Sequence, residues 1–210
     1  MEIETSKILG GVGAILLLIG MIPYSYLGVI ALVGLILLMI SLYNLAKYYS
    51  ESGIFNNVLY GLIIAVVGGV VSVAVGIYAV LSSVADFFYA IFPGWNGDWA
   101  TIPGMMPDWS NLSMDVLIPL LSGIIAVFLI LWIAAIVSTF FVKRSWGSLA
   151  VKSGVGLFST AGLLLFIGAL LLIIFVGFVL IWVALLLAAI AFFRMKFQQS
   201  QPTTSAAAPV

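Results

Sequence analysis

The residues that could do chemistry gather in one stretch of the chain, residues 86–115. This stretch holds four of the seven acidic residues, Asp86, Asp98, Asp108 and Asp115, and three methionines. Carboxylates are calcium ligands, and thioethers bind soft ions such as Cu(I). The aspartate spacing matches no known calcium loop, and the chain has no cysteine or histidine to complete a soft-metal site. We therefore expect no metal, no cofactor and no catalytic residue.

Three tryptophans, Trp95, Trp99 and Trp109, occupy the same stretch, together with four other aromatic residues, three prolines and no basic residue. Tryptophan is enriched where proteins meet lipid headgroups. It is also a frequent anchor in protein interfaces. Two interpretations therefore stay open: a loop that lies along a membrane surface, and a surface that binds a partner protein.

A possible modification site also falls in this stretch. Asn111-Leu-Ser113 is the only N-x-[ST] sequence in the chain, and this pattern is the acceptor signal for N-glycosylation. Such short motifs are often unused. Asn111 is a candidate glycosylation site whose use the sequence does not decide.

The rest of the chain is strongly apolar. Of 210 residues, 65% are hydrophobic and 7% are charged, and the mean hydropathy is +1.35. Soluble domains carry roughly 25% charged residues, so lipid is the expected solvent. The formal net charge is zero, which gives no electrostatic reason to expect binding to nucleic acid.

The apolar runs predict an all-α, polytopic transmembrane helix bundle of six spans within residues 1–196. A helix needs about 20 apolar residues to cross a bilayer. The run Gly154–Phe193 would be about 60 Å long as one helix, so we expect a turn near Ile173–Gly177. The predicted spans are residues 8–24, 27–45, 54–85, 116–142, 154–173 and 176–193. Whether residues 8–45 cross twice or form a re-entrant hairpin stays open, and residues 197–210 are expected to be a disordered tail.

The basic residues support this count. With six spans and a cytoplasmic N-terminus, all seven lysines and arginines fall on the cytoplasmic side and none on the other. Basic residues are enriched in cytoplasmic loops. We therefore expect both termini in the cytoplasm, residues 86–115 outside, and a multi-pass protein of the cell membrane.

Small residues recur every fourth position in the third predicted span. Small residues at this spacing let helix backbones approach closely in lipid. We predict packing within the bundle, while an oligomer interface or a pore-lining face stays open. The two series are Gly61, Ala65 and Gly69, and Gly68, Ser72 and Gly76.

The spans lack the ionisable residues that ion-coupled transporters keep at membrane depth; the one candidate, Asp86, lies at the outer end of the third span. This absence favours a non-catalytic accessory or scaffold component, with a membrane-protein partner or further copies of the chain, over an enzyme. The alternative is a channel or transporter for a small uncharged solute, which the glycine-rich spans and a weak likeness between the first and last predicted hairpins would allow.

Several motifs are similar to those of a known family. They are TAGLLLFIG at residues 160–168, KILGG at 7–11 and IFNNVLYG at 54–61, with Val176-Gly-Phe178 and Ala191-Phe-Phe193. Across most of residues 5–196 the chain resembles archaeal multi-span membrane proteins grouped as domain of unknown function 996. The resemblance implies the same membrane arrangement and brings no activity, ligand or catalytic residue.

Overall fold

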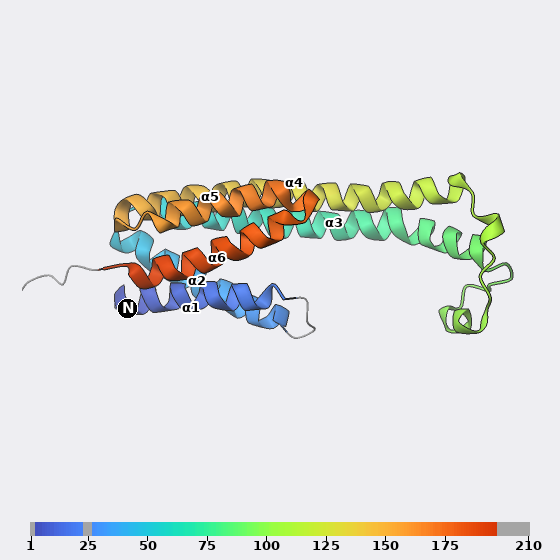
Figure 1. Ribbon diagram of the computed structural model, residues 1–210, viewed down its shortest axis with the longest axis horizontal. Coiled ribbons are helices and arrows are strands. Elements are labelled where there is room, and N and C mark those ends of the chain that lie inside the picture. The colour runs from blue at the N-terminus through green and yellow to red at the C-terminus, as the bar shows by residue number, and fades with distance from the viewer. Residues whose placement is uncertain (1–2, 23–26, 197–210) are drawn as a thin grey trace, which may run out of the picture. The chain divides into compact units, whose positions relative to one another are not determined.

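The computed structural model describes residues 3–22 and 27–196, and within these ranges it contains helices and no strand (Figure 1). The predicted tail, residues 197–210, lies outside the described residues. Among the described residues, six helices are long and apolar enough to cross a membrane, which confirms the predicted fold class. In chain order the elements are α1 (Ile3–Gly20), α2 (Leu27–Tyr48), α3 (Gly53–Ile91), η1 (Trp99–Gly104), η2 (Trp109–Asn111), α4 (Met114–Ser153), α5 (Leu157–Leu170), η3 (Leu171–Ile174) and α6 (Val176–Arg194).

The turn expected in the last apolar run is present. The helix direction changes at Phe175, which adopts a left-handed conformation with φ 61° after η3. α3 and α4 are longer than the predicted spans, at 39 and 40 residues. α4 ends before Gly154, whose φ of 72° is a conformation that glycine adopts without steric cost.

The chain divides into two compact units. Of the described residues, the first unit contains 3–22, 27–56, 144–164 and 182–196, and the second contains 57–143 and 165–181. Long helices run through both units, so the division cuts α3, α4, α5 and α6 rather than falling in loops. Each unit is described below by itself.

In the first unit, α1 and α2 pack with their backbones in close approach. A Cβ added at Gly13 would lie 2.7 Å from the Gly34 carbonyl oxygen. The buried Ser41 hydroxyl donates a hydrogen bond to the Ser6 carbonyl at 2.6 Å. Phe192 of α6 meets Phe158 of α5 edge to face, with ring centroids 4.8 Å apart. Close glycine contacts and hydrogen bonds of this kind hold helices together where lipid supplies no hydrophobic drive.

In the second unit, α3 and α4 run side by side as a long antiparallel hairpin (Figure 1). Gly61 and Gly68 face α4: an added Cβ would lie 2.8 Å from the Ser138 carbonyl oxygen and 2.3 Å from the Ala134 Cβ, respectively. The structure therefore places these two glycines in packing within the unit, as expected.

The other members of the two series are placed differently. Ser72 is buried, and a Cβ added at Gly76 would make ordinary contact with α4, at 3.6 Å from Val127. A Cβ added at Gly69 would meet nothing within 4 Å, and Ala65 is exposed. Only part of the small-residue pattern thus serves helix contact within the unit.

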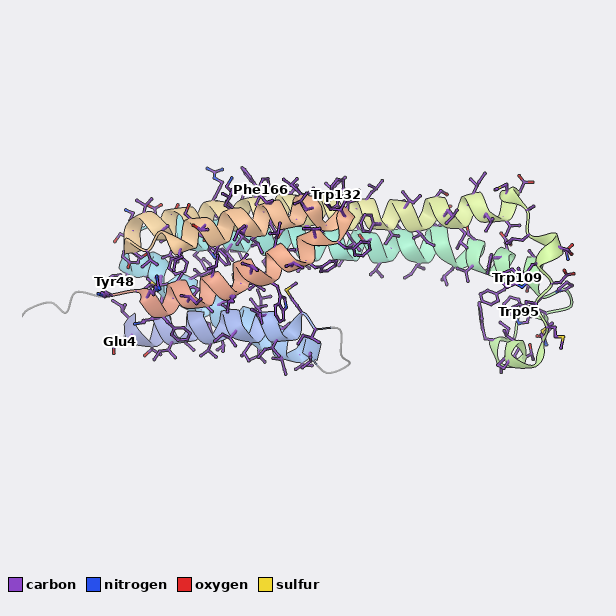
Figure 2. All side chains as sticks on the ribbon, viewed as in Figure 1. Glu4, Tyr48, Trp95, Trp109, Trp132 and Phe166 are labelled. Atoms are coloured by element: carbon purple, nitrogen blue, oxygen red, sulfur yellow. The ribbon has the colours of Figure 1, made fainter. Side chains whose placement is uncertain are left out.

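The α5–α6 turn also belongs to the second unit and packs against the middle of α4. The indole nitrogen of Trp132 donates a hydrogen bond to the Ala169 carbonyl at 3.0 Å (Figure 2). Gly168 and Gly177 let the two helices approach, since a Cβ at Gly168 would lie 3.0 Å from the Gly177 carbonyl oxygen. The end of the hairpin beyond Trp132 carries the aspartates, the three tryptophans and Asn111 that the sequence analysis selected.

Candidate functional site: the aromatic head

The α3–α4 hairpin ends in a small folded segment, residues 87–113, which we call the aromatic head. α3 enters it at Phe87, and α4 leaves it at Met114. The Asp108 amide donates a hydrogen bond to the Ile91 carbonyl at 2.6 Å. This bond ties the second half of the head to the last turn of α3, so the head is a folded structure rather than an open loop.

The head has its own buried core, made of Ile91, Phe92 and Trp95. Partly buried side chains from along the whole head pack against it: Phe87, Phe88, Ile102, Met105 and Leu112. Aromatic rings in edge-to-face or tilted contact add to the stabilisation from buried area. The aromatic content of the head therefore has a structural use as well as a surface use.

Two Asp-Trp pairs shape the rest of the head. The Asp98 carboxylate accepts a hydrogen bond from the Ala100 amide at 3.0 Å and begins η1. The Asp108 carboxylate accepts from the Ser110 amide at 3.0 Å and from the Ser110 hydroxyl at 2.7 Å, and begins η2. The Ser110 hydroxyl and amide lower the pKa of Asp108, because both hydrogen bonds favour the charged carboxylate.

Sequence reasoning missed this structural role of Asp98 and Asp108. The signal was present, since Asp98-Trp-Ala-Thr101 and Asp108-Trp-Ser-Asn111 share the order acid, tryptophan, small residue, polar residue. Aspartate side chains commonly accept a hydrogen bond from the backbone amide two residues later.

In the described part of the chain, no group of three or more histidine, cysteine, aspartate or glutamate side chains is placed to hold a metal.

The three tryptophans fall into two environments. Trp95 is 6% exposed, and its indole nitrogen donates to the Asp98 carbonyl at 2.8 Å. The proposed contact of Trp95 with a partner does not fit this burial: the side chain belongs to the core of the head. Trp99 and Trp109 are 53% and 60% exposed.

Trp99 is held in place although it is exposed. Its ring packs edge to face on Trp95 at 4.8 Å and on Phe88 at 4.9 Å between centroids. Trp109 projects from η2 at the far end of the hairpin (Figure 2). Met106, in the same head, is 92% exposed. The head therefore presents large, partly ordered apolar side chains outside its own core.

Asn111, the candidate glycosylation site, is exposed in η2. Its amide nitrogen lies 3.3 Å from an Asp108 carboxylate oxygen, to which it donates a hydrogen bond. A sugar attached to that nitrogen would therefore alter the contact with Asp108. Glycosylation of Asn111 stays a prediction.

The surface of the head is acidic. Asp98 and Asp108 lie in it, Asp86 and Asp115 flank it, and all four are exposed; residues 86–115 contain no basic residue. Exposed aromatic and methionine side chains beside carboxylates suit binding to a surface that is apolar at its centre and basic at its rim.

Comparison with known proteins places the chain in a family. The family model described as "Protein of unknown function (DUF996)" matches residues 30–186. A protein of Methanocaldococcus jannaschii, "Uncharacterized protein MJ1644", is 27% identical over 195 residues, which cover 93% of this chain and 94% of the relative. No solved structure matches the chain. Because the family model covers well over half of the chain, the protein belongs to the DUF996 family, which includes archaeal proteins.

Proposed function

We propose that this protein is a non-catalytic accessory or scaffold subunit of the cell membrane that binds a partner membrane protein through its aromatic head. The observation that carries the proposal is the exposure of Trp99, Trp109 and Met106 on a head that already has a core of its own. Exposed side chains of these types, held on a folded support, are typical of the centre of protein interfaces.

The orientation follows from the basic residues. With six spans, all seven lysines and arginines lie on one side of the bilayer, which the positive-inside rule assigns to the cytoplasm. The head, which has none, then lies outside. Its partner must offer an extracellular surface or an outer loop.

The length of the hairpin favours binding of the head to a partner protein and disfavours a head that lies along the lipid surface. The α5–α6 turn, which this topology places outside, packs against α4 at Trp132. From Trp132 the helix continues outward to Met114, which is about 27 Å and places the head beyond the headgroup layer.

The carboxylates indicate the kind of partner. Asp98 and Asp108 are exposed beside the two surface tryptophans. Complementary charge speeds association and excludes wrong partners. We expect the bound surface to carry lysine or arginine around an apolar centre, and the association to weaken as the ionic strength rises.

Purification of tagged protein from its own membranes in mild detergent tests the proposal. The wild type is expected to bring one stoichiometric membrane protein with it, and the Trp99→Ala, Trp109→Ala double variant is expected to lose it. Trp182→Ala is the matched control, because Trp182 on α6 is 44% exposed and lies outside the head. Retention of the companion by the double variant would reject the head as the binding site.

A channel or transporter for a small uncharged solute is the second candidate. An apolar groove of about 410 Å³ lies between α3 and α4 and is lined by residues that include Ile63, Val67, Val71 and Ala134. An apolar solute could occupy such a groove. Liposomes that contain the purified protein and pass no solute from a broad panel would count against this function.

A further inference from the structure

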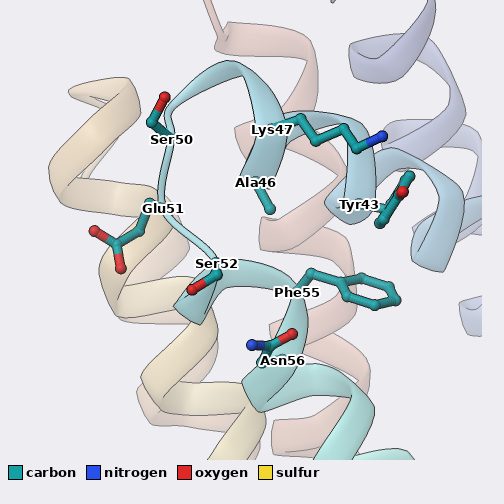
Figure 3. Close-up of a pocket in the computed structure, with 8 residues that line it drawn as sticks. All are labelled: Tyr43, Ala46, Lys47, Ser50, Glu51, Ser52, Phe55 and Asn56. Atoms are coloured by element: carbon teal, nitrogen blue, oxygen red, sulfur yellow. The ribbon is translucent and has the colours of Figure 1, made fainter.

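A second site lies far along the chain from the aromatic head, at the corner between α2 and α3. A pocket of about 310 Å³ opens there within the first unit (Figure 3). Its lining consists of Tyr43, Ala46, Lys47, Ser50, Glu51, Ser52, Phe55 and Asn56. The volume is in the range of small-molecule sites.

One wall of this pocket is apolar and ordered. Tyr43 of α2 and Phe55 of α3 meet edge to face with centroids 5.2 Å apart, and the Ala46 methyl group lies beside them (Figure 3). The Lys47 ammonium lies 4.5 Å from the centre of the Tyr43 ring. A cation–π contact of this kind holds the positive charge at the edge of the apolar wall.

The pocket also has a polar lining. Ser52 and Asn56 are exposed and offer a hydroxyl and an amide. They lie at the start of α3, where the positive end of the helix dipole favours an anion. The pocket thus combines polar groups with an apolar wall.

The charges around the pocket favour an anion over a cation. Glu51 also lines it, but its carboxylate lies 3.5 Å from the Lys152 ammonium and is neutralised by that ion pair. Lys47, Lys152 and Glu51 together leave one excess positive charge. That charge is carried by Lys47, whose ammonium lies over the Tyr43 ring at the edge of the apolar wall (Figure 3).

We propose that this pocket binds the phosphate group of a membrane lipid, with Lys47 as the cation and Ser52 and Asn56 as hydrogen-bond donors. Two apolar helices end here, so the pocket opens where a bilayer meets water, and Tyr43 and Phe55 suit the apolar part of an amphiphile. Free phosphate offers the same headgroup chemistry without the apolar part. The proposal does not depend on the aromatic head or on its partner.

Thermal unfolding of the purified full-length protein in a neutral detergent tests the site. The probes are phosphatidylglycerol, inorganic phosphate, and dioleoylglycerol as an amphiphile without phosphate. Phosphatidylglycerol is expected to raise the unfolding temperature and dioleoylglycerol to leave it unchanged. Lys47→Gln is expected to weaken the effect about tenfold in lipid concentration, since it removes a charge-assisted contact.

Lys196→Gln is the matched control, because Lys196 is an exposed lysine of the same unit and does not line the pocket. Lys47→Arg should restore the effect and shows that the glutamine variant is folded. Equal protection by inorganic phosphate would assign the site to free phosphate. Protection by dioleoylglycerol equal to that by phosphatidylglycerol, or equal behaviour of the two glutamine variants, would overturn the proposal.

Discussion

The two Asp-Trp pairs of the head show how adjacent residues divide between structure and surface. Asp98 and Asp108 begin short helical turns through their carboxylates, and the tryptophan that follows each one remains exposed. The sequence left two interpretations of this segment open, a loop along the membrane surface and a surface that binds a partner. It could not separate Trp95 from Trp99 and Trp109, because the core that contains Trp95 also includes Ile102 and Met105 from later in the chain.

The buried and exposed tryptophans should respond oppositely to substitution. Trp95→Ala removes a ring that is 6% exposed and should cost about 3–5 kcal/mol of local stability, the usual loss for a core aromatic. Trp109→Ala should change stability by less than about 0.5 kcal/mol. Limited proteolysis of the head measures both, and equal cleavage of the two variants would show that Trp95 is not a core residue.

The charge on Asp108 should depend on Ser110. The hydrogen bonds from Ser110 hold the pKa of Asp108 below its ordinary value, so the stabilisation is present above about pH 3.9 and disappears as the pH falls through the depressed pKa. Ser110→Ala removes the hydroxyl donor and should raise the pKa toward the ordinary value. Carboxyl-carbon NMR follows this titration, and an unchanged pKa in the variant would contradict the assignment.

At the scale of helices, the sequence predicted which helices are present and where the last apolar run turns, but it did not predict where the helices end. Five apolar runs predicted six spans, because the uncharged run Gly154–Phe193 was too long for one, and the described residues contain six helices of sufficient length. α3 continues to Ile91, because Phe87, Phe88 and Ile91 pack into the head. A hydropathy pattern cannot show that continuation, since it arises from contacts with residues later in the chain.

Adjacent glycines of α3 give a direct test of helix packing. Gly68→Ala should destabilise the protein by about 1–2 kcal/mol, because the new Cβ would meet Ala134 of α4 at 2.3 Å and overpack the contact. Gly69→Ala has open space around it and should be neutral or stabilising by up to about 1 kcal/mol, through helix propensity. Equilibrium unfolding in detergent gives both values, and equal effects would exclude the proposed α3–α4 contact.

For the molecule as a whole, the contacts define two compact units, a division that the sequence did not indicate. The helices are apolar around most of their circumference, as expected for spans in lipid, so no polar face indicates which helices pack together. Close contacts such as those of Gly13 with Gly34 and of Gly168 with Gly177 carry that information. These contacts depend on how one helix is aligned along its neighbour, which the spacing of glycines within a single helix does not show.

Sidedness is testable with single cysteines, because the chain has none of its own. Ala100→Cys, in the exposed part of the head, should react with a membrane-impermeant maleimide added to intact cells. Lys152→Cys, also exposed, should react only after lysis, because all basic residues are assigned to the cytoplasm. The reverse pattern would invert the proposed topology.

The central claim is that the head binds a partner protein outside the membrane. Its most direct test places a photoreactive benzoylphenylalanine at position 109 and irradiates intact cells. We predict one discrete protein adduct, lost in the presence of Trp99→Ala and absent when the photoreactive residue replaces Trp182 of α6. Adducts with lipid alone, or the same protein adduct from both positions, would contradict the account.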